Sequence, residues 1–116
     1  MTRPSHDALH VLRLLGHLMV NQGNAAHGMT LLQAVEALQP GDRWTRRALA
    51  RACLVAGRPA EGLKVVQLMQ RDGDAPALTC LLEGQALQGL GRHTDAYRAY
   101  REFLRLRAAR PEGAAA

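Results

Sequence analysis

The stretch that decides the fold is LRLLGHLMVNQGNAAHG at residues 12–28, because its small residues return twice along the chain. The corresponding stretches are RRALARACLVAGRPAEG at 46–62 and CLLEGQALQGLGRHTDA at 80–96. Three series of small residues keep a spacing of 34 residues: Gly16, Ala50 and Gly84; Gly23, Gly57 and Gly91; and Gly28, Gly62 and Ala96.

A period of about 34 residues is typical of the tetratricopeptide repeat, a helix–turn–helix unit. The sequence therefore predicts a single all-α domain over 1–116, with repeats at 9–42, 43–76 and 77–110 and a short flexible tail at 111–116. Six helices should stack as antiparallel pairs into a short right-handed superhelix. They are expected at about 7–21, 25–38, 43–56, 59–71, 76–89 and 93–108, from apolar spacing and helix end signals.

The small residues have two expected roles. Gly23 should end the first helix with a positive φ, which glycine adopts without steric cost. The series at Gly16 and Gly28 should mark where paired helices cross closely. Asn24, Asp42 and Asp74 are predicted to cap the helices that follow them, and Pro59 and Pro76 to lie in first helical turns.

Composition excludes several classes of protein. Isoleucine is absent, alanine and leucine dominate, and the four aromatic residues are few, which disfavours a β-sandwich or barrel. No apolar run approaches the roughly 20 residues that span a bilayer. The N-terminal apolar stretch contains His and Arg and lacks a small-residue cleavage site, so we expect a cytoplasmic protein without stable membrane insertion.

Catalytic motifs are not visible. The chain has no G-x-S-x-G, phosphate-binding loop or dinucleotide fingerprint, and its carboxylates are scattered, so we expect no enzyme and no cofactor. His6, His10 and His17 lie at helical spacing, but no third and fourth ligand follows a metal-site pattern, and no metal site is predicted.

The predicted binding surface is the concave groove, which first helices line at positions two, five, nine and twelve of each repeat. Trp44, the single tryptophan, falls on this surface beside arginines, and both residue types are common in binding hot spots. The alternative is that Trp44 packs between repeats. The predicted partner-binding residues are His10, Arg13, His17, Trp44, Arg47, Arg51, Leu54, Leu78, Leu81 and Gln85.

Two further features concern the surface. The last helix carries Tyr97, Tyr100, Phe103, Leu104 and Leu106, which cannot all face inward, so an uncapped apolar edge is expected there. Arginines cluster at Arg43, Arg46, Arg47 and Arg51 and again at Arg98, Arg101 and Arg105, a pattern that leaves nucleic-acid binding as a rival hypothesis. Aromatic stacking platforms are missing, and we expect no nucleic-acid partner.

The chain resembles the small tetratricopeptide chaperones of bacterial type III secretion systems, above all the YscY type. The likeness rests on Leu14-Leu15-Gly16, Gly23-Asn24, Leu31-Leu32, Ala37-Leu38-Gln39-Pro40, Arg46-Arg47, Gly57 and Ala96-Tyr97-Arg98-Ala99-Tyr100.

This resemblance implies a non-catalytic chaperone that binds a small secreted X-type export protein as a heterodimer. The pair would then engage the cytoplasmic domain of the export-gate protein. A chaperone of needle subunits or of other secreted proteins is an alternative, as is a generic tetratricopeptide scaffold.

Overall fold

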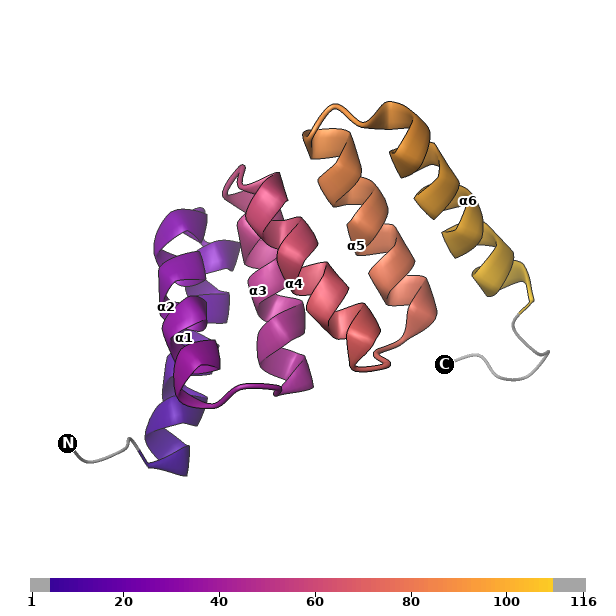
Figure 1. The fold of residues 1–116 in the computed structure, drawn as a ribbon. Coiled ribbons are helices and arrows are strands. Elements are labelled where there is room, and N and C mark those ends of the chain that lie inside the picture. The colour runs from indigo at the N-terminus through magenta and orange to yellow at the C-terminus, as the bar shows by residue number, and fades with distance from the viewer. Residues whose placement is uncertain (1–4, 110–116) are drawn as a thin grey trace.

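The computed structural model describes residues 5–109, which form six α-helices and no strands (Figure 1). The all-α prediction is confirmed, and every predicted helix boundary lies within one residue of the observed one. The tail expected at 111–116 lies outside the described residues. The helices are α1 (His6–Asn21), α2 (Ala25–Leu38), α3 (Arg43–Val55), α4 (Pro59–Arg71), α5 (Pro76–Gly89) and α6 (His93–Ala108).

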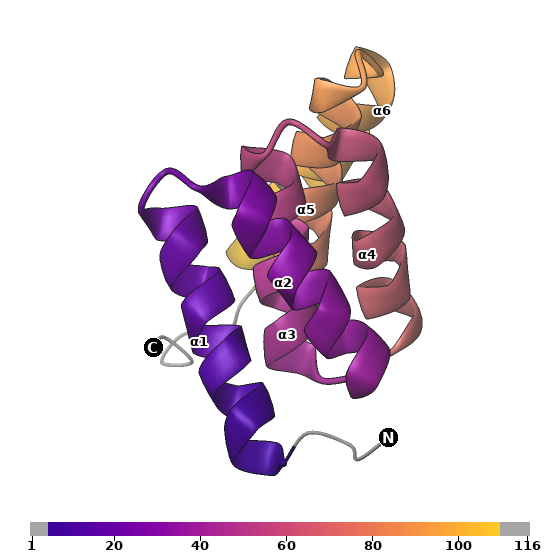
Figure 2. The same cartoon turned by 90° about the vertical axis from the view of Figure 1, so that its left-hand side faces the viewer.

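The helices follow one another in chain order from one end of the molecule to the other (Figure 1). Each helix packs on the next, and α3 also contacts both α1 and α5. In the described part of the chain, α2, α4 and α6 make no contact with one another. Figure 2 views the series from the end at which α1 and α2 lie. The layer of α1, α3 and α5 is therefore the tighter, inner one. The tetratricopeptide assignment and the handedness of the superhelix stay predictions.

The paired helices cross where the small residues were predicted to let them approach. A Cβ atom on Gly28 would lie 2.7 Å from the carbonyl oxygen of Gly16 and 2.7 Å from Val20 Cγ2. A Cβ on Gly84 would lie 2.5 Å from a ring carbon of Tyr100. At Gly28 the obstacle is backbone, so a larger side chain would push α1 and α2 apart. At Gly84 the obstacle is the Tyr100 side chain, which would have to move.

Several predicted turn features are confirmed. Gly23 has φ 82°, in the left-handed region that glycine favours. The carboxylate of Asp42 caps α3 by accepting a hydrogen bond from the Thr45 backbone N–H at 2.9 Å. Helices α4 and α5 begin at their prolines.

Two capping predictions need correction. Asn24 is the N-cap residue of α2 as predicted, but its side chain makes no capping bond, and its Oδ1 lies 2.5 Å from His27 Nδ1 instead. Asp74 is not the N-cap of α5; that position belongs to Ala75. The carboxylate of Asp74 instead forms an ion pair with Arg47 on α3, and the only backbone N–H that it accepts within residues 5–109 is that of the N-cap residue Ala75.

Candidate partner-binding groove

A pocket of about 310 Å³ opens on the inner layer of helices, between α1, α3 and α5. Every lining residue belongs to one of these three helices, because they alone form the layer described above. Five of the ten predicted partner-binding residues meet here. The lining residues are His17 from α1, Trp44, Arg47, Ala48 and Arg51 from α3, and Leu78 and Leu82 from α5.

Trp44 lines two neighbouring hollows on this surface. It is the second residue of α3, and 42% of its surface remains exposed. Its ring centroid is 5.6 Å from that of His17, with the two rings tilted by 58°. On its other side Trp44 borders a smaller pocket of about 190 Å³ that His10 and Leu14 also line. One tryptophan therefore separates two hollows and presents a broad apolar face to any ligand.

Arg47 is held in place by a buried acid. Its Nε donates to Asp74 Oδ2 at 3.0 Å, and its Nη2 donates to Asp74 Oδ1. The Asp74 side chain is 1% exposed and also accepts the Ala75 backbone N–H at 2.7 Å. The hydrogen bonds from Arg47 lower the pKa of Asp74, and the same pairing raises the pKa of Arg47. Arg47 therefore joins α3 to the start of α5 as well as lining the pocket.

Arg51 differs from Arg47 although it lies one turn further along α3. Its side chain is exposed and forms no ion pair with any residue in 5–109. A guanidinium at the edge of an apolar pocket is available for an anionic group on a bound partner.

Arg13 lines the smaller pocket beside Trp44, but little of its side chain is open to solvent. It is only 6% exposed, because its Nε donates to Thr45 Oγ1 at 2.8 Å and its Nη2 donates to Gln39. Its Nε also lies 3.5 Å from a carboxylate oxygen of Asp42. These contacts fasten α1 to the start of α3, so Arg13 positions the helices that carry the pocket.

The remaining predicted residues lie apart from the central pocket. His10 lines the smaller pocket beside Trp44. Leu54 and Gln85 line a third hollow of about 440 Å³ near the far ends of α3 and α5. Leu81 is half-buried and lines none of the hollows described here.

Sequence reasoning missed one series of lining residues. Leu14, Ala48 and Leu82 occupy the sixth position of the three repeats, and each lines one of the two hollows that Trp44 borders. The repeat spacing contained the signal for this series, because each of its residues lies one helical turn after a predicted groove residue. Those predicted residues are His10, Trp44 and Leu78.

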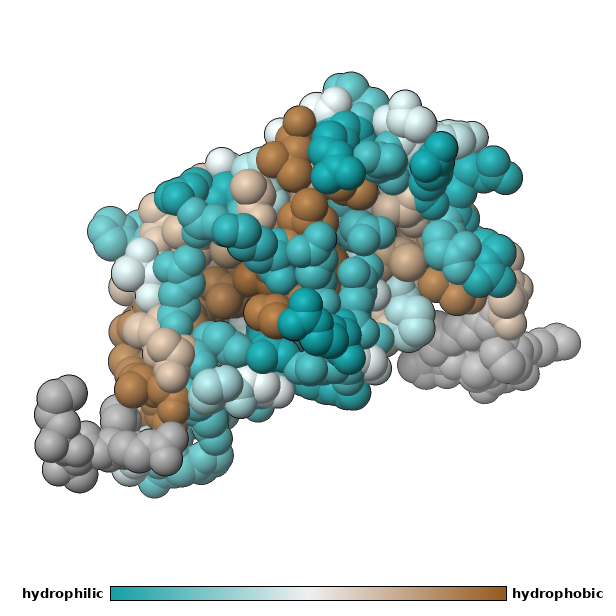
Figure 3. All heavy atoms as spheres, viewed as in Figure 1, coloured by the Kyte–Doolittle hydropathy of each residue, from teal (hydrophilic) through white to brown (hydrophobic). Residues whose placement is uncertain are grey.

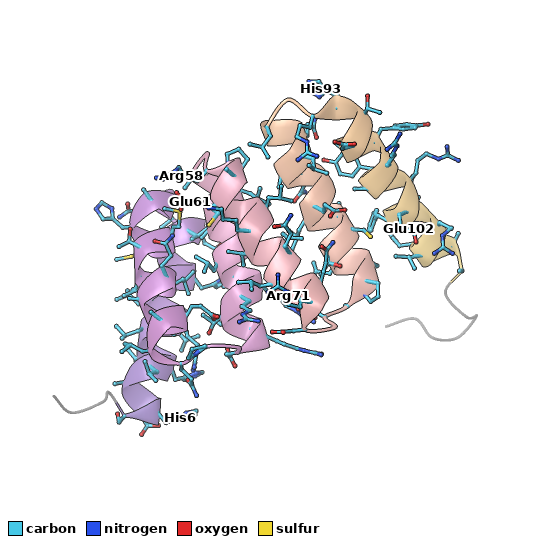
Figure 4. The ribbon with its side chains drawn as sticks, viewed as in Figure 1. His6, Arg58, Glu61, Arg71, His93 and Glu102 are labelled. Atoms are coloured by element: carbon cyan, nitrogen blue, oxygen red, sulfur yellow. The ribbon has the colours of Figure 1, made fainter. Side chains whose placement is uncertain are left out.

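Many arginines are neutralised within the chain. Arg46 donates from Nε to Glu36 at 2.9 Å and also pairs with Asp72. Burial disfavours its charged form, but those two carboxylates outweigh burial and raise its pKa. Arg58 pairs with Glu61 at the start of α4, where Figure 4 shows both side chains. The arginine cluster on α3 is therefore less cationic than the sequence suggests.

No three His, Cys, Asp or Glu side chains within residues 5–109 are grouped so that they could hold a metal ion. In the same range no helix has both the length and the apolar character needed to cross a membrane. Neither a protein-family model nor a curated protein matches the chain.

Proposed function

We propose that this chain is a non-catalytic cytosolic chaperone of a bacterial type III secretion system. It binds a small secreted X-type export protein in the groove and helps to deliver it to the export gate. The observation that supports binding is the pocket formed jointly by α1, α3 and α5, with the partly exposed Trp44 in its wall. The resemblance to the YscY type supports the choice of client.

The pocket determines what kind of client segment fits. Its volume of about 310 Å³ and its apolar lining suit one or two large apolar side chains from a helix or an extended segment. Trp44 supplies contact area, and Arg51 supplies an unpaired positive charge. A client segment with apolar side chains next to an acidic one would satisfy both features. Covering such a segment before export would prevent it from aggregating.

The test is to co-express the chain with its X-type client, purify the complex and measure affinity by isothermal titration calorimetry. Trp44→Ala and Arg51→Glu should each weaken binding by about tenfold or more. Arg47 is unsuitable for this purpose because its replacement would leave the buried Asp74 without its partner.

Matched controls are available on the outer helices. Tyr97→Ala removes an aromatic residue on α6 that is 62% exposed, and Arg71→Glu reverses an exposed charge on α4, which Figure 4 labels. Both should bind the client like the wild type. If Trp44→Ala binds normally, the groove is not the site. If the wild type forms no complex with the X-type protein, the client is wrong, and a needle subunit is the next to test.

The nucleic-acid hypothesis is weakened by the ion pairs within the chain. Arg46 and Arg47 form ion pairs with carboxylates of the chain itself, and Arg105 forms one with Glu102. These arginines are therefore less available to phosphate groups. Salt-dependent binding to random oligonucleotides with micromolar affinity would favour it over the chaperone proposal.

A further inference from the structure

The groove between α3 and α5 contains two hollows in line, the central pocket and the third hollow. The central pocket is lined by α3 over 44–51 and by α5 over 78–82, and the third hollow by α3 over 54–55 and by α5 over 85–89. The two helices therefore run in the same direction, and a ligand lying along them would meet both hollows. The opposite side of the molecule, where α2 and α4 lie, is covered mainly by hydrophilic residues (Figure 3).

The two hollows are separated by the same distance on both helices. On α3, Ala48 lines the central pocket and Val55, seven residues later, lines the third hollow. On α5, Leu82 and Gly89 have the same relation. Seven residues span about 10.5 Å along a helix axis. A ligand that fills both hollows must therefore present two side chains about 10.5 Å apart on one side.

An α-helix presents side chains at this distance, and an extended strand does not. Residues seven positions apart on a helix lie on the same face and are about 10.5 Å apart along the axis. On a strand, side chains of one face recur about every 6.7 Å, so their separations of about 6.7 and 13.4 Å miss the second hollow by about 3–4 Å. The spacing of the hollows therefore favours a helix that lies along α3 and α5.

Charge at the boundary between the two hollows selects the middle of this helix. Arg51 on α3 and Gln85 on α5 are 34 residues apart, so they occupy the same level of the groove. Both are exposed, and Arg51 forms no ion pair with any residue in 5–109. A ligand residue three or four positions after the first apolar residue lies on the same face, midway between the hollows. An acidic residue at that position would pair with the Arg51 guanidinium.

We propose that the groove binds an amphipathic client helix that carries two large apolar side chains seven residues apart and an acidic side chain between them. One apolar side chain enters the central pocket beside Trp44. The other enters the third hollow beside Leu54 and Val55. This proposal rests on the proposed function, in which the groove is the client-binding site, and it adds the third hollow to that site.

The test uses synthetic helical peptides of about 18 residues, whose binding is followed by the fluorescence of Trp44, the single tryptophan of the chain. The first peptide is rich in alanine, with two leucines seven residues apart and a glutamate four residues after the first leucine. The second has the same composition, but its leucines are five residues apart and so lie on different sides of the helix. The third has lysine in place of the glutamate. The first should bind at least about tenfold more tightly than the other two in titrations up to about 1 mM.

Three variants of the chain locate the peptide. Arg51→Glu should reverse the preference, so that the lysine peptide binds more tightly than the glutamate peptide. Val55→Glu should weaken binding of the first peptide at least about tenfold, because it places a charge in an apolar hollow. Val11→Glu is the matched control, since Val11 and Val55 are 60% and 54% exposed. Val11 lies on the exposed apolar face of α1 with Leu15 and Leu18, and it lines none of the hollows described above.

Val11→Glu should bind the first peptide like the wild type, and far-UV circular dichroism should show that all three variants keep their helices. Equal binding of the first two peptides, or binding of none, overturns the inference, even where Trp44→Ala weakens the complex with the X-type client. Normal binding of the first peptide by Val55→Glu also overturns it, and a preference for glutamate that survives in Arg51→Glu overturns the acidic residue. A chain that shows the expected peptide preferences but does not bind the X-type protein refutes the choice of client and supports the helical ligand.

Discussion

Replacing Gly28 and Gly62 by alanine should have different effects, although each is the fourth residue of its helix. At Gly28 the new Cβ would lie 2.7 Å from the carbonyl oxygen of Gly16, a backbone atom that cannot rotate away. Helices α1 and α2 would have to separate. At Gly62 the nearest atom is Leu54 Cδ2 at 3.2 Å, the end of a flexible side chain that can move aside.

Two opposing contributions set the magnitude. Alanine gains about 1 kcal/mol of helix propensity over glycine at either site. Overpacking costs about 1–3 kcal/mol, with the upper part of that range expected where backbone is the obstacle. Gly28→Ala should therefore lower the free energy of unfolding by about 2 kcal/mol. Gly62→Ala should change it by less than about 1 kcal/mol. Helix α6 already carries alanine at this position, and Ala96 is 3% exposed.

Urea denaturation followed by far-UV circular dichroism measures both effects. A loss of about 2 kcal/mol corresponds to a fall of about 8 °C in the melting temperature of a domain this size. The reasoning is refuted if the two variants lose equal stability, or if Gly28→Ala is as stable as the wild type.

Three other predictions follow from buried polar groups and thiols. Arg13→Met should lower the free energy of unfolding by about 2 kcal/mol, because it removes the hydrogen bond to Thr45 that links α1 to α3. An unchanged midpoint of urea denaturation would contradict this prediction. Hydrogen bonds from Arg47 are the main reason why the pKa of Asp74 is lowered from its usual value of 3.8. The ionised carboxylate therefore contributes its full stabilisation above pH 3.8. This stabilisation is lost as the pH falls towards the lowered pKa. Asp74→Asn should lower stability at pH 7 and make it fall less steeply below pH 4 than in the wild type, as checked by thermal melts across that range; parallel pH profiles would argue against the pairing. Burial raises the pKa of the Cys53 thiol to about 11. At pH 8 a thiol reagent should therefore modify half-buried Cys80 first and Cys53 only when the protein unfolds. Equal modification rates for the two thiols would show that Cys53 is accessible in the folded protein.

The caps show where local sequence rules succeed and where they fail. Asp42 caps α3 as predicted, because the backbone N–H and the hydroxyl of Thr45, only three residues away, both donate to its carboxylate. Asp74 has the same local pattern, a glycine followed by an aspartate. It pairs instead with Arg47, which lies 27 residues earlier in the chain. No local rule anticipates a partner that only the packing of α3 against α5 provides.

The groove likewise contains residues that the repeat spacing placed correctly and residues whose position depends on tertiary packing. The repeat register placed Trp44 and four other predicted residues around one pocket, since a constant period puts equivalent positions on one face. Arg13 occupies an equivalent position but is buried, because Thr45, Gln39 and Asp42 surround its guanidinium. The apolar edge expected on α6 is partly closed, since Tyr100 packs over Gly84 and donates a hydrogen bond to Gln88 at 2.7 Å.

The sequence by itself determined the six helices, their ends and the crossings at small residues, because those depend on spacing and on glycine stereochemistry along one chain. The tertiary structure alone decided which arginines are free, and it showed that the most open apolar face lies on α1. Both depend on which side chains from distant parts of the chain come within contact distance. A periodic pattern assigns the same environment to every repeat, whereas within residues 5–109 α1 contacts only α2 and α3.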